Sequence, residues 1–172
     1  MVEIILYNGG AAGDMVAAVI DPREYIFEGD HLAATTVDRI KLRHRIQLTM
    51  TDEERDIYIA TTPYYSLACH LADYLVSRKH DFILIDSSDR EYAKWASNRL
   101  FKIWGGKFPW FQEPHEPESH EILYNRASPF TNRVITLKDI LEGNLIKRLE
   151  NLTDKKLHGD IYKKWLELNI FP

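Results

Sequence analysis

Residues 82–104, FILIDSSDREYAKWASNRLFKIW, join a short apolar run to a long amphipathic one. The run Phe82–Ile85 is continuously apolar and predicts a buried strand, and the polar residues after it supply a turn and a helix cap. Apolar side chains then recur at helical spacing on one face up to Trp104, and Gly105 with Gly106 ends the predicted helix. A strand, a turn and a helix in this order are typical of an α/β fold.

Two other segments have the same pattern. Residues 3–7 predict a strand, followed by a glycine-rich turn and a helix over residues 11–20. Residues 56–60 predict another strand, followed by an amphipathic helix from Tyr64 to about His80. We therefore predict a three-layer α/β sandwich with a mainly parallel sheet, whose central strands include residues 3–7, 56–60 and 82–85.

A basic amphipathic strand is predicted at residues 39–48, because polar and apolar residues alternate almost strictly there. Its basic side chains are Arg39, Lys41, Arg43 and Arg45. They indicate either an edge strand that uses charge against aggregation or a surface for an anionic partner, and the first interpretation is favoured.

The last third of the chain begins with residues 105–133, which carry four of the seven prolines and no sustained periodicity. A connection of this length is functional or mobile, and it is a candidate lid. Residues 134–135 then predict a short strand. A helix start capped by Thr136 continues past Gly143 to about Leu152, and residues 161–168 form a final amphipathic segment.

Composition limits the class of protein. The chain has 172 residues, which predicts a single α/β domain over residues 1–172, and a net charge of −4, which argues against a general nucleic-acid-binding surface. Its single cysteine, Cys69, allows no intrachain disulfide. No apolar run has the length of a membrane span and no signal peptide is evident, so we expect no membrane association and a cytoplasmic location. The oligomeric state stays open.

The turn after the first strand is the main candidate site. Its residues Asn8, Gly9, Gly10, Ala11 and Gly13 stand where a phosphate-binding loop stands, between a strand and a helix N-terminus. The lysine and hydroxyl of a complete phosphate loop are missing, and the carboxylate of Asp14 would repel phosphate. The loop is either an anion site or a tight packing turn. If it is an anion site, Gly10→Val is expected to abolish nucleotide binding and leave the fold intact.

The carboxyl ends of parallel strands meet at one edge of a sheet, so we expect Asn8, Gly10, Thr61 and Asp86 to line one crevice. Ser87, Ser88, Arg90 and Lys94 join them as candidate ligand-binding residues, and Arg90 or Lys94 would stabilise an anion. No catalytic residue is assigned.

Residues 113–121 are a candidate metal site, because two histidines and four glutamates share a proline-broken loop there. Structural zinc sites hold their ligands on more regular elements, so a solvated acidic loop is favoured and no metal ligand is assigned.

Parts of this sequence resemble compact sulfotransferase-like proteins of the P-loop superfamily, which occur in phages and marine bacteria. The similar parts are the first turn, the unit from Phe82 to Lys102, and the ending from Val134 to Asn169 with its VITLKDIL and YKKWLELN segments. The resemblance covers about half the chain. It implies a sulfate-donor nucleotide held by the first loop and, at its 3′-phosphate, by an arginine and a serine after the strand at 82–85.

This chain departs from that pattern. Asp86 takes the arginine position, Arg90 comes a few residues later, and Ser97 is an approximate match for the serine. The resemblance therefore implies either a small group-transfer enzyme that binds a phosphorylated nucleotide, such as a sulfate donor, through a degenerate phosphate loop, or a non-catalytic partner-binding module of the same fold with a decayed nucleotide site.

Overall fold

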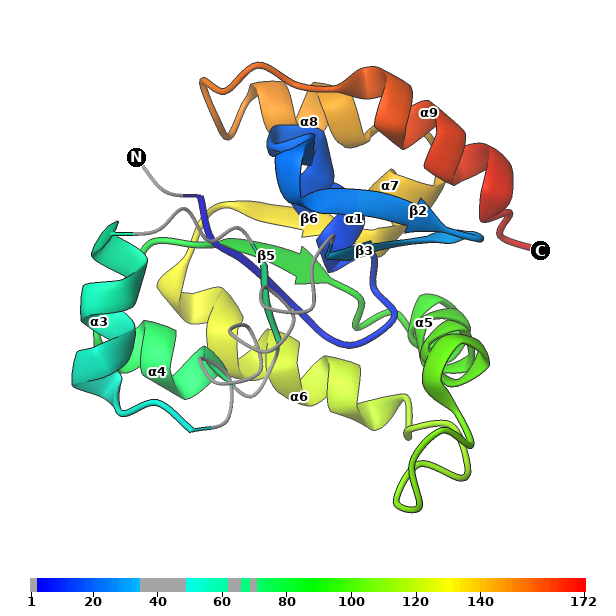
Figure 1. Cartoon of the computed structure of the whole chain (residues 1–172), viewed down its shortest axis with the longest axis horizontal. Helices are drawn as coiled ribbons and strands as arrows, with labels where there is room; N and C mark the ends of the chain where they lie inside the picture. Colours follow the sequence, from blue (N-terminus) through cyan, green and yellow to red (C-terminus); the bar gives the residue numbers. More distant parts are fainter. Residues whose placement is uncertain (1–2, 35–48, 62–65, 69–70) are drawn as a thin grey trace.

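The computed structural model describes residues 3–34, 49–61, 66–68 and 71–172. Its main sheet has four parallel strands in the order β4-β1-β5-β6, and Figure 1 shows helices on both of its faces. The strands are β1 (Ile5–Tyr7), β4 (Ser66–Ala68), β5 (Ile83–Asp86) and β6 (Val134–Thr136). After β1 the chain adds the next strand of this sheet, β4, on one side of β1, and after β5 it adds β6 on the opposite side of the sheet. The order of strands therefore reverses between β1 and β5. Ligands of such sheets bind outside the carboxyl ends of the strands at this switch point.

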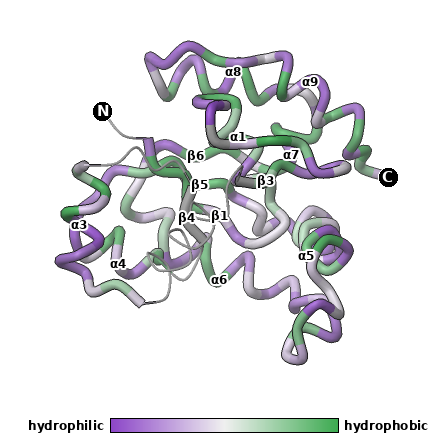
Figure 2. The backbone as a smooth tube through the Cα atoms, in the orientation of Figure 1, coloured by the Kyte–Doolittle hydropathy of each residue, from purple (hydrophilic) through white to green (hydrophobic). Residues whose placement is uncertain are grey.

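Alternating side chains of the central strands pack into two cores. Ile5, Ile83 and Ile85 face one core, which α1 (Gly13–Ile20), α7 (Leu137–Leu141), α8 (Leu145–Glu150) and α9 (Gly159–Leu168) complete. Leu6 and Leu84 face the other, which α3 (Asp52–Thr61), α4 (Ala72–Ser77) and α6 (Glu118–Ala127) cover. Because successive strand residues point to opposite faces, both faces of this sheet are buried. Figure 2 shows that hydrophilic and hydrophobic residues alternate along the outer helices α8 and α9, as expected for helices with one face in the core and one face in solvent.

The helix α5 (Arg90–Trp104) follows β5, and an antiparallel hairpin of β2 (Tyr25–Glu28) and β3 (His31–Ala34) follows α1. Within the described ranges, short 3-10 turns η1 (Pro22–Glu24) and η3 (Ser128–Phe130) lie between elements. Figure 1 places α5 beside the end of the sheet at which β1 and β5 finish, whereas β2 and β3 lie over α1. Among the described residues no helix combines the length and the apolar character needed to cross a bilayer.

The predictions for the central strands are confirmed at residues 3–7 and 82–85, since β1 and β5 are the two inner strands. The helix predicted after β5, the short strand at 134–135 and the final amphipathic helix are also present. Thr136 caps α7 as expected, because its side chain accepts a hydrogen bond from the Asp139 N–H at 3.0 Å.

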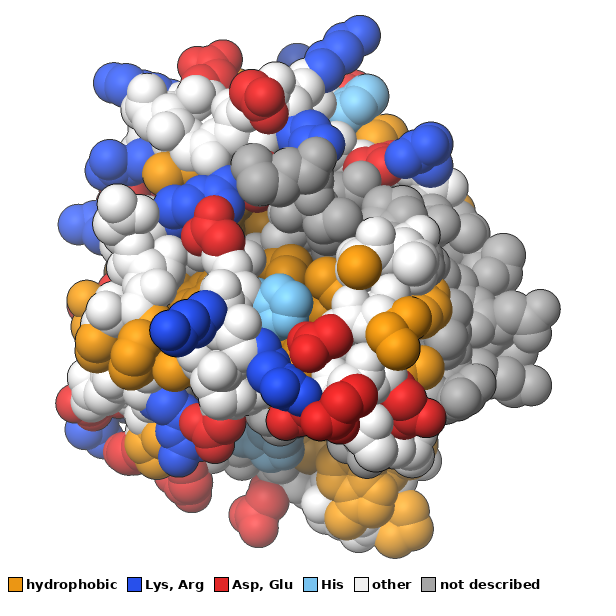
Figure 3. All heavy atoms as spheres, turned by 90° about the vertical axis from the view of Figure 1, so that its left-hand side faces the viewer, with side chains coloured by type: hydrophobic (Ala, Val, Ile, Leu, Met, Phe, Trp, Pro, Cys, Tyr) orange, Lys and Arg blue, Asp and Glu red, His pale blue; other side chains and the backbone are white. Residues whose placement is uncertain are grey.

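The predicted strand at residues 56–60 is wrong, because this segment lies in α3. Thr51 and Glu54 form a capping box: the Thr51 N–H donates to Glu54 Oε2 at 2.8 Å, and the Glu54 N–H donates to Thr51 Oγ1 at 3.3 Å. These bonds satisfy N–H groups that a helix start otherwise leaves unpaired. Only Ile59 of this helix is buried, so most of the segment lies at the surface and not in the centre of the sheet. Figure 3 shows the side of the molecule that carries α3, where acidic and basic side chains are interspersed.

Three other expectations need correction. The predicted helix from Tyr64 to His80 contains β4 and the shorter α4, and the third parallel strand is therefore β4. The helix predicted to pass Gly143 is divided into α7 and α8, because Gly143 adopts a φ of 90°. Residues 105–133, expected to lack regular structure, contain α6. The predicted basic strand at 39–48 and Cys69 lie outside the described residues.

The helical assignment of residues 52–61 gives a first test. Thr51→Ala removes the cap of α3 and is expected to lower the free energy of unfolding by about 1 kcal/mol. Thr61→Ala is the matched control, because its hydroxyl only bonds back to carbonyls at the far end of the same helix. Urea unfolding followed by circular dichroism measures both. Equal effects of the two substitutions would contradict the capping box.

Candidate functional site

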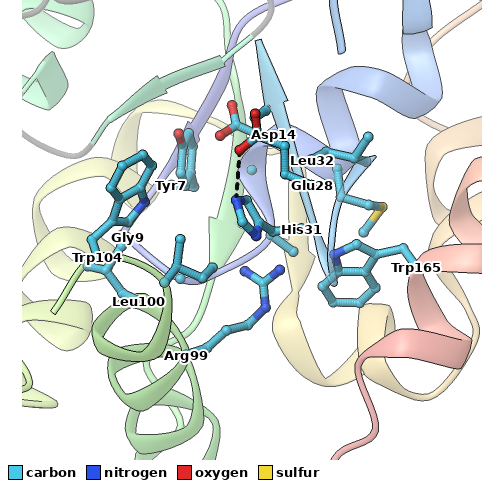
Figure 4. A pocket seen from close by; sticks show the side chains of 16 residues that line it. Tyr7, Gly9, Asp14, Glu28, His31, Leu32, Arg99, Leu100, Trp104 and Trp165 are labelled. Atoms are coloured by element: carbon cyan, nitrogen blue, oxygen red, sulfur yellow. Dashed lines mark ion pairs between the residues drawn. The ribbon is translucent and has the colours of Figure 1, made fainter. Parts of the chain in front are cut away.

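A cavity of about 350 Å³ lies outside the carboxyl end of β1, between the loop 8–13, the hairpin β2–β3 and the last turns of α5. This volume falls in the range typical of small-molecule sites, and the walls are mainly apolar. Figure 4 shows labelled side chains from these elements converging on it. The residues that line it are Tyr7, Gly9, Gly10, Ala12, Gly13, Asp14, Met15, Glu28, His31, Leu32, Ala33, Arg99, Leu100, Ile103, Trp104 and Trp165.

The glycines of the loop permit close packing. A Cβ atom on Gly10 would lie 1.9 Å from the carbonyl oxygen of Ala96 in α5, and Gly10 has a φ of 84°. A Cβ atom on Gly13 would lie 2.1 Å from the ring of Tyr7, and one on Gly9 would lie 2.5 Å from Leu100 Cδ2. Gly10→Val therefore cannot leave the fold intact, contrary to expectation, because the added carbon would collide with helix backbone.

The same loop presents backbone donors. Ala12, the N-cap of α1, adopts a φ of 66° and makes no side-chain cap. The N–H groups of Gly10, Ala12, Gly13 and Met15 have no hydrogen-bond acceptor within the part of the chain that the structure describes. The first N–H groups of a helix lack intrahelical partners and carry partial positive charge, so they favour an acceptor in the cavity.

Arg99 places a guanidinium in the cavity (Figure 4). Its Nε donates to Asn169 Oδ1 at 2.9 Å and its Nη2 donates weakly to the Asp30 carbonyl at 3.4 Å. No carboxylate among the described residues lies within ion-pair distance of this guanidinium. Burial lowers the pKa of Arg99, and Asp30 and Asp14 oppose that shift at longer range. An arginine nevertheless stays charged in proteins, so the cavity holds a poorly solvated cation.

Asn169 holds Arg99 in this position. The Asn169 amide is buried, and its Nδ2 donates to the Asp30 carbonyl at 2.7 Å and to the Trp165 carbonyl at 2.9 Å. Its Oδ1 is thereby left facing the Nε of Arg99. The rings of Trp95 and Trp165 flank the guanidinium, with their centroids 5.8 and 5.4 Å from Cζ. This packing fixes the arginine fork before any ligand arrives.

The opposite side of the cavity is acidic. Asp14 lies in the first turn of α1, and Glu28 and His31 end and begin the two strands of the hairpin. His31 Nε2 lies 3.7 Å from Glu28 Oε2, the ion pair drawn in Figure 4, and His31 Nδ1 lies 3.6 Å from Asp30 Oδ1. The cavity therefore joins carboxylates, an imidazole and a guanidinium, a combination that binds polar groups of both signs.

The predicted ligand-binding residues are distributed over several places. Gly9, Gly10 and Gly13 line the cavity. Asn8 and Ala11 are buried and do not line it. Thr61 ends α3, so it does not share a strand-end crevice with Asn8, Gly10 and Asp86 as expected. Arg90 and Lys94 are exposed on the first half of α5. The ligand-binding role of each of these residues stays a prediction.

Asp86 and Ser88 line a second cavity of about 400 Å³ with Asp89, Tyr92, Thr136 and Lys138. The Asp86 carboxylate is occupied locally, since it accepts hydrogen bonds from the Ser88 N–H at 2.9 Å and the Ser88 hydroxyl at 2.6 Å. The single expected crevice is therefore two cavities, one beside β1 and one beside β5 and β6.

Ser87 belongs to a buried network. Its Oγ lies 2.5 Å from Nδ1 of His120, and Ser97 Oγ lies 3.2 Å from Nε2 of the same ring. A neutral imidazole has one donor and one acceptor, and these two hydroxyls satisfy both. His120, one of the two histidines of the segment 113–121, thus joins α6 to α5 and to Ser87, the residue after β5. Within the described ranges, no group of three or more histidine, cysteine or acidic side chains is placed to hold a metal.

Sequence reasoning missed Glu28, His31 and Arg99. The hairpin had a local signal, because Gly29-Asp30 between two alternating segments is typical of a two-residue turn. No local sequence pattern marked Arg99, because its position beside the loop depends on how α5 packs. Comparison with protein-family models, curated protein sequences and solved structures gives no match for this chain.

The buried His120 gives a pH test. Burial, with a smaller contribution from His115, lowers the pKa of His120 from about 6.5 to about 4. Between these values the unfolded chain binds a proton that the folded chain does not, so stability falls as the pH falls through this window. The expected loss is about 3 kcal/mol between pH 7 and pH 4.

The comparison is with His120→Gln, which cannot titrate. Chemical unfolding at a series of pH values should show a steeper loss for the unsubstituted protein than for the variant. His115→Gln, at an exposed position, should keep most of the steep dependence. Parallel curves for the unsubstituted protein and His120→Gln would contradict a buried neutral imidazole.

Proposed function

We propose that the protein binds a small phosphorylated or sulfated ligand of the nucleotide class in the cavity beside β1. The observation that carries this proposal is the guanidinium of Arg99, which is partly buried, faces the cavity and lacks a carboxylate partner within the described residues. A cation in this state is costly unless an anion meets it. The fork of an arginine matches phosphate and sulfate oxygens.

The position of the cavity supports the proposal. It lies at the carboxyl end of an inner strand of a parallel sheet, beside the N-terminus of α1, where unpaired N–H groups of the loop add donors. Leu100, Ile103 and the Trp104 ring offer an apolar wall, against which a planar base can pack. The anion contact is assigned to Arg99, because Asp14 places a carboxylate at the loop itself.

A group-transfer enzyme of sulfotransferase-like ancestry is the second candidate, favoured by His31. This imidazole lines the cavity and lies near the carboxylates of Glu28 and Asp30, so it can accept a proton from an attacking hydroxyl and hold the resulting charge. A non-catalytic module would use the cavity for binding alone. Phosphorus NMR separates the two: an enzyme consumes a nucleotide donor in a reaction that His31→Gln slows, and a module leaves the nucleotide intact.

Substitution of Arg99 tests the proposal. Isothermal titration with nucleoside monophosphates, inorganic phosphate and sulfate should show binding that Arg99→Gln weakens by about 10–100-fold, the worth of a charged hydrogen bond. Arg99→Lys keeps the charge, and we expect an intermediate effect because the fork is lost.

The matched control is Arg90→Gln, which removes the same charge from the exposed start of the same helix. Circular dichroism checks that each variant is folded. Absence of binding to the unsubstituted protein at millimolar ligand, or equal effects of Arg90→Gln and Arg99→Gln, would overturn the proposal.

A further inference from the structure

The two sides of the cavity carry opposite charge. In Figure 4 the guanidinium of Arg99 lies on one side, the carboxylates of Asp14 and Glu28 lie on the other, and His31 stands between them. A ligand that is negative along its whole length would place some of that charge against the two carboxylates. Like charges in a partly desolvated site repel each other, so the acidic side selects against such a ligand.

Hydrogen-bond donors suit the acidic side. An ionised carboxylate only accepts hydrogen bonds, so Asp14 and Glu28 can bind an amino group but not a carbonyl oxygen. Among planar bases, cytosine presents an exocyclic amino group where uracil presents a carbonyl oxygen, and carboxylates accept from that cytosine amino group in nucleic-acid recognition. The bases differ little in size, so the carboxylates and not the apolar wall would distinguish them.

We propose that the cavity selects nucleoside monophosphates whose base carries an exocyclic amino group, with the phosphate at Arg99 and the amino group at Asp14 and Glu28. This inference rests on the proposed nucleotide-binding function and assigns its specificity to two carboxylates. The opposite charges on the two sides of one cavity then fix the direction in which the ligand lies. Trp104, Leu100 and Ile103 contact the ring between the two polar ends.

The test compares CMP with UMP, and AMP with IMP, by isothermal titration at one pH and ionic strength. Each pair differs by an amino group against a carbonyl oxygen, so size and phosphate charge stay matched. We expect CMP and AMP to bind at least tenfold more tightly than their partners. Glu28→Gln should reduce this preference, because a glutamine amide donates as well as accepts. The Glu28 side chain is 56% exposed, so this substitution leaves the fold undisturbed.

The double variant Asp14→Asn with Glu28→Gln should abolish the preference and retain phosphate-dependent binding through Arg99. Asp73→Asn is the control, because it removes a carboxylate from the exposed surface of α4. If CMP and UMP bind equally, or UMP binds better, and Arg99→Gln weakens both, the specificity is wrong and the proposed function stands. If no nucleotide binds, both fail. An amino preference that survives the double variant would also overturn the assignment to these carboxylates.

Discussion

The turn after β1 lies so close to α5 that Gly10 has no room for a side chain. A carbon at the Cβ position of Gly10 would be 1.9 Å from the Ala96 carbonyl oxygen, and no side-chain rearrangement relieves this clash because the carbonyl belongs to the helix backbone. Leu100, one helical turn further on, occupies the equivalent space beside Gly9. This contact sets the distance between the first strand and the helix that follows β5. It also brings the last turns of α5, with Arg99 and Trp104, over the cavity.

Charge in the cavity follows from the same packing. Arg99 follows Ala96 by three residues, so the contact at Gly10 positions the segment of α5 that carries the guanidinium. On the other side of the cavity, the hairpin β2–β3 contributes Glu28 and His31, and its turn residue Asp30 binds Lys102 of α5 at 2.8 Å. Asn169, just after α9, joins Asp30 to Arg99. Three segments distant in sequence, namely α5, the hairpin and the residue after α9, thus meet at one polar centre.

Local signals in the sequence were sufficient for much of the fold. The apolar run at 82–85 and the periodic helix after it are strong local patterns, and β5 and α5 were predicted from them. The error at residues 56–60 has an identifiable cause: the apolar residues around Ile57 predicted a strand, and the Thr51-Glu54 capping pattern, a more specific signal of a helix start, was not considered. A central strand of a parallel sheet is buried on both faces, whereas this segment buries only Ile59 and therefore fits a surface helix.

The candidate site was less accessible from sequence. The sequence identified the glycines of the first loop. The structural requirement for them is close contact with α5 and Tyr7, and such tertiary contacts cannot be predicted from the loop sequence. Arg90 and Lys94, in the first half of the helix after β5, were predicted to bind an anion, but it is Arg99, further along the same helix, that lines the cavity. The segment with His120 was expected to be a solvated acidic loop, and only the packing of α6 shows that this imidazole is buried against two serines. Side chains that are brought together by tertiary packing cannot be recognised from the spacing of residues in the sequence.

The most direct measurement is NMR of the ¹⁵N-labelled protein during titration with CMP, followed at the backbone amides and at the arginine Nε–Hε groups. The account predicts saturable shifts at Arg99 Nε–Hε and at the amides of Gly10 and Gly13, with the amides of Asp86 and Ser88 beside the second cavity unmoved. Saturable shifts at Asp86 and Ser88 with an unmoved Arg99 signal would contradict it, because the ligand would then occupy the other end of the strand edge.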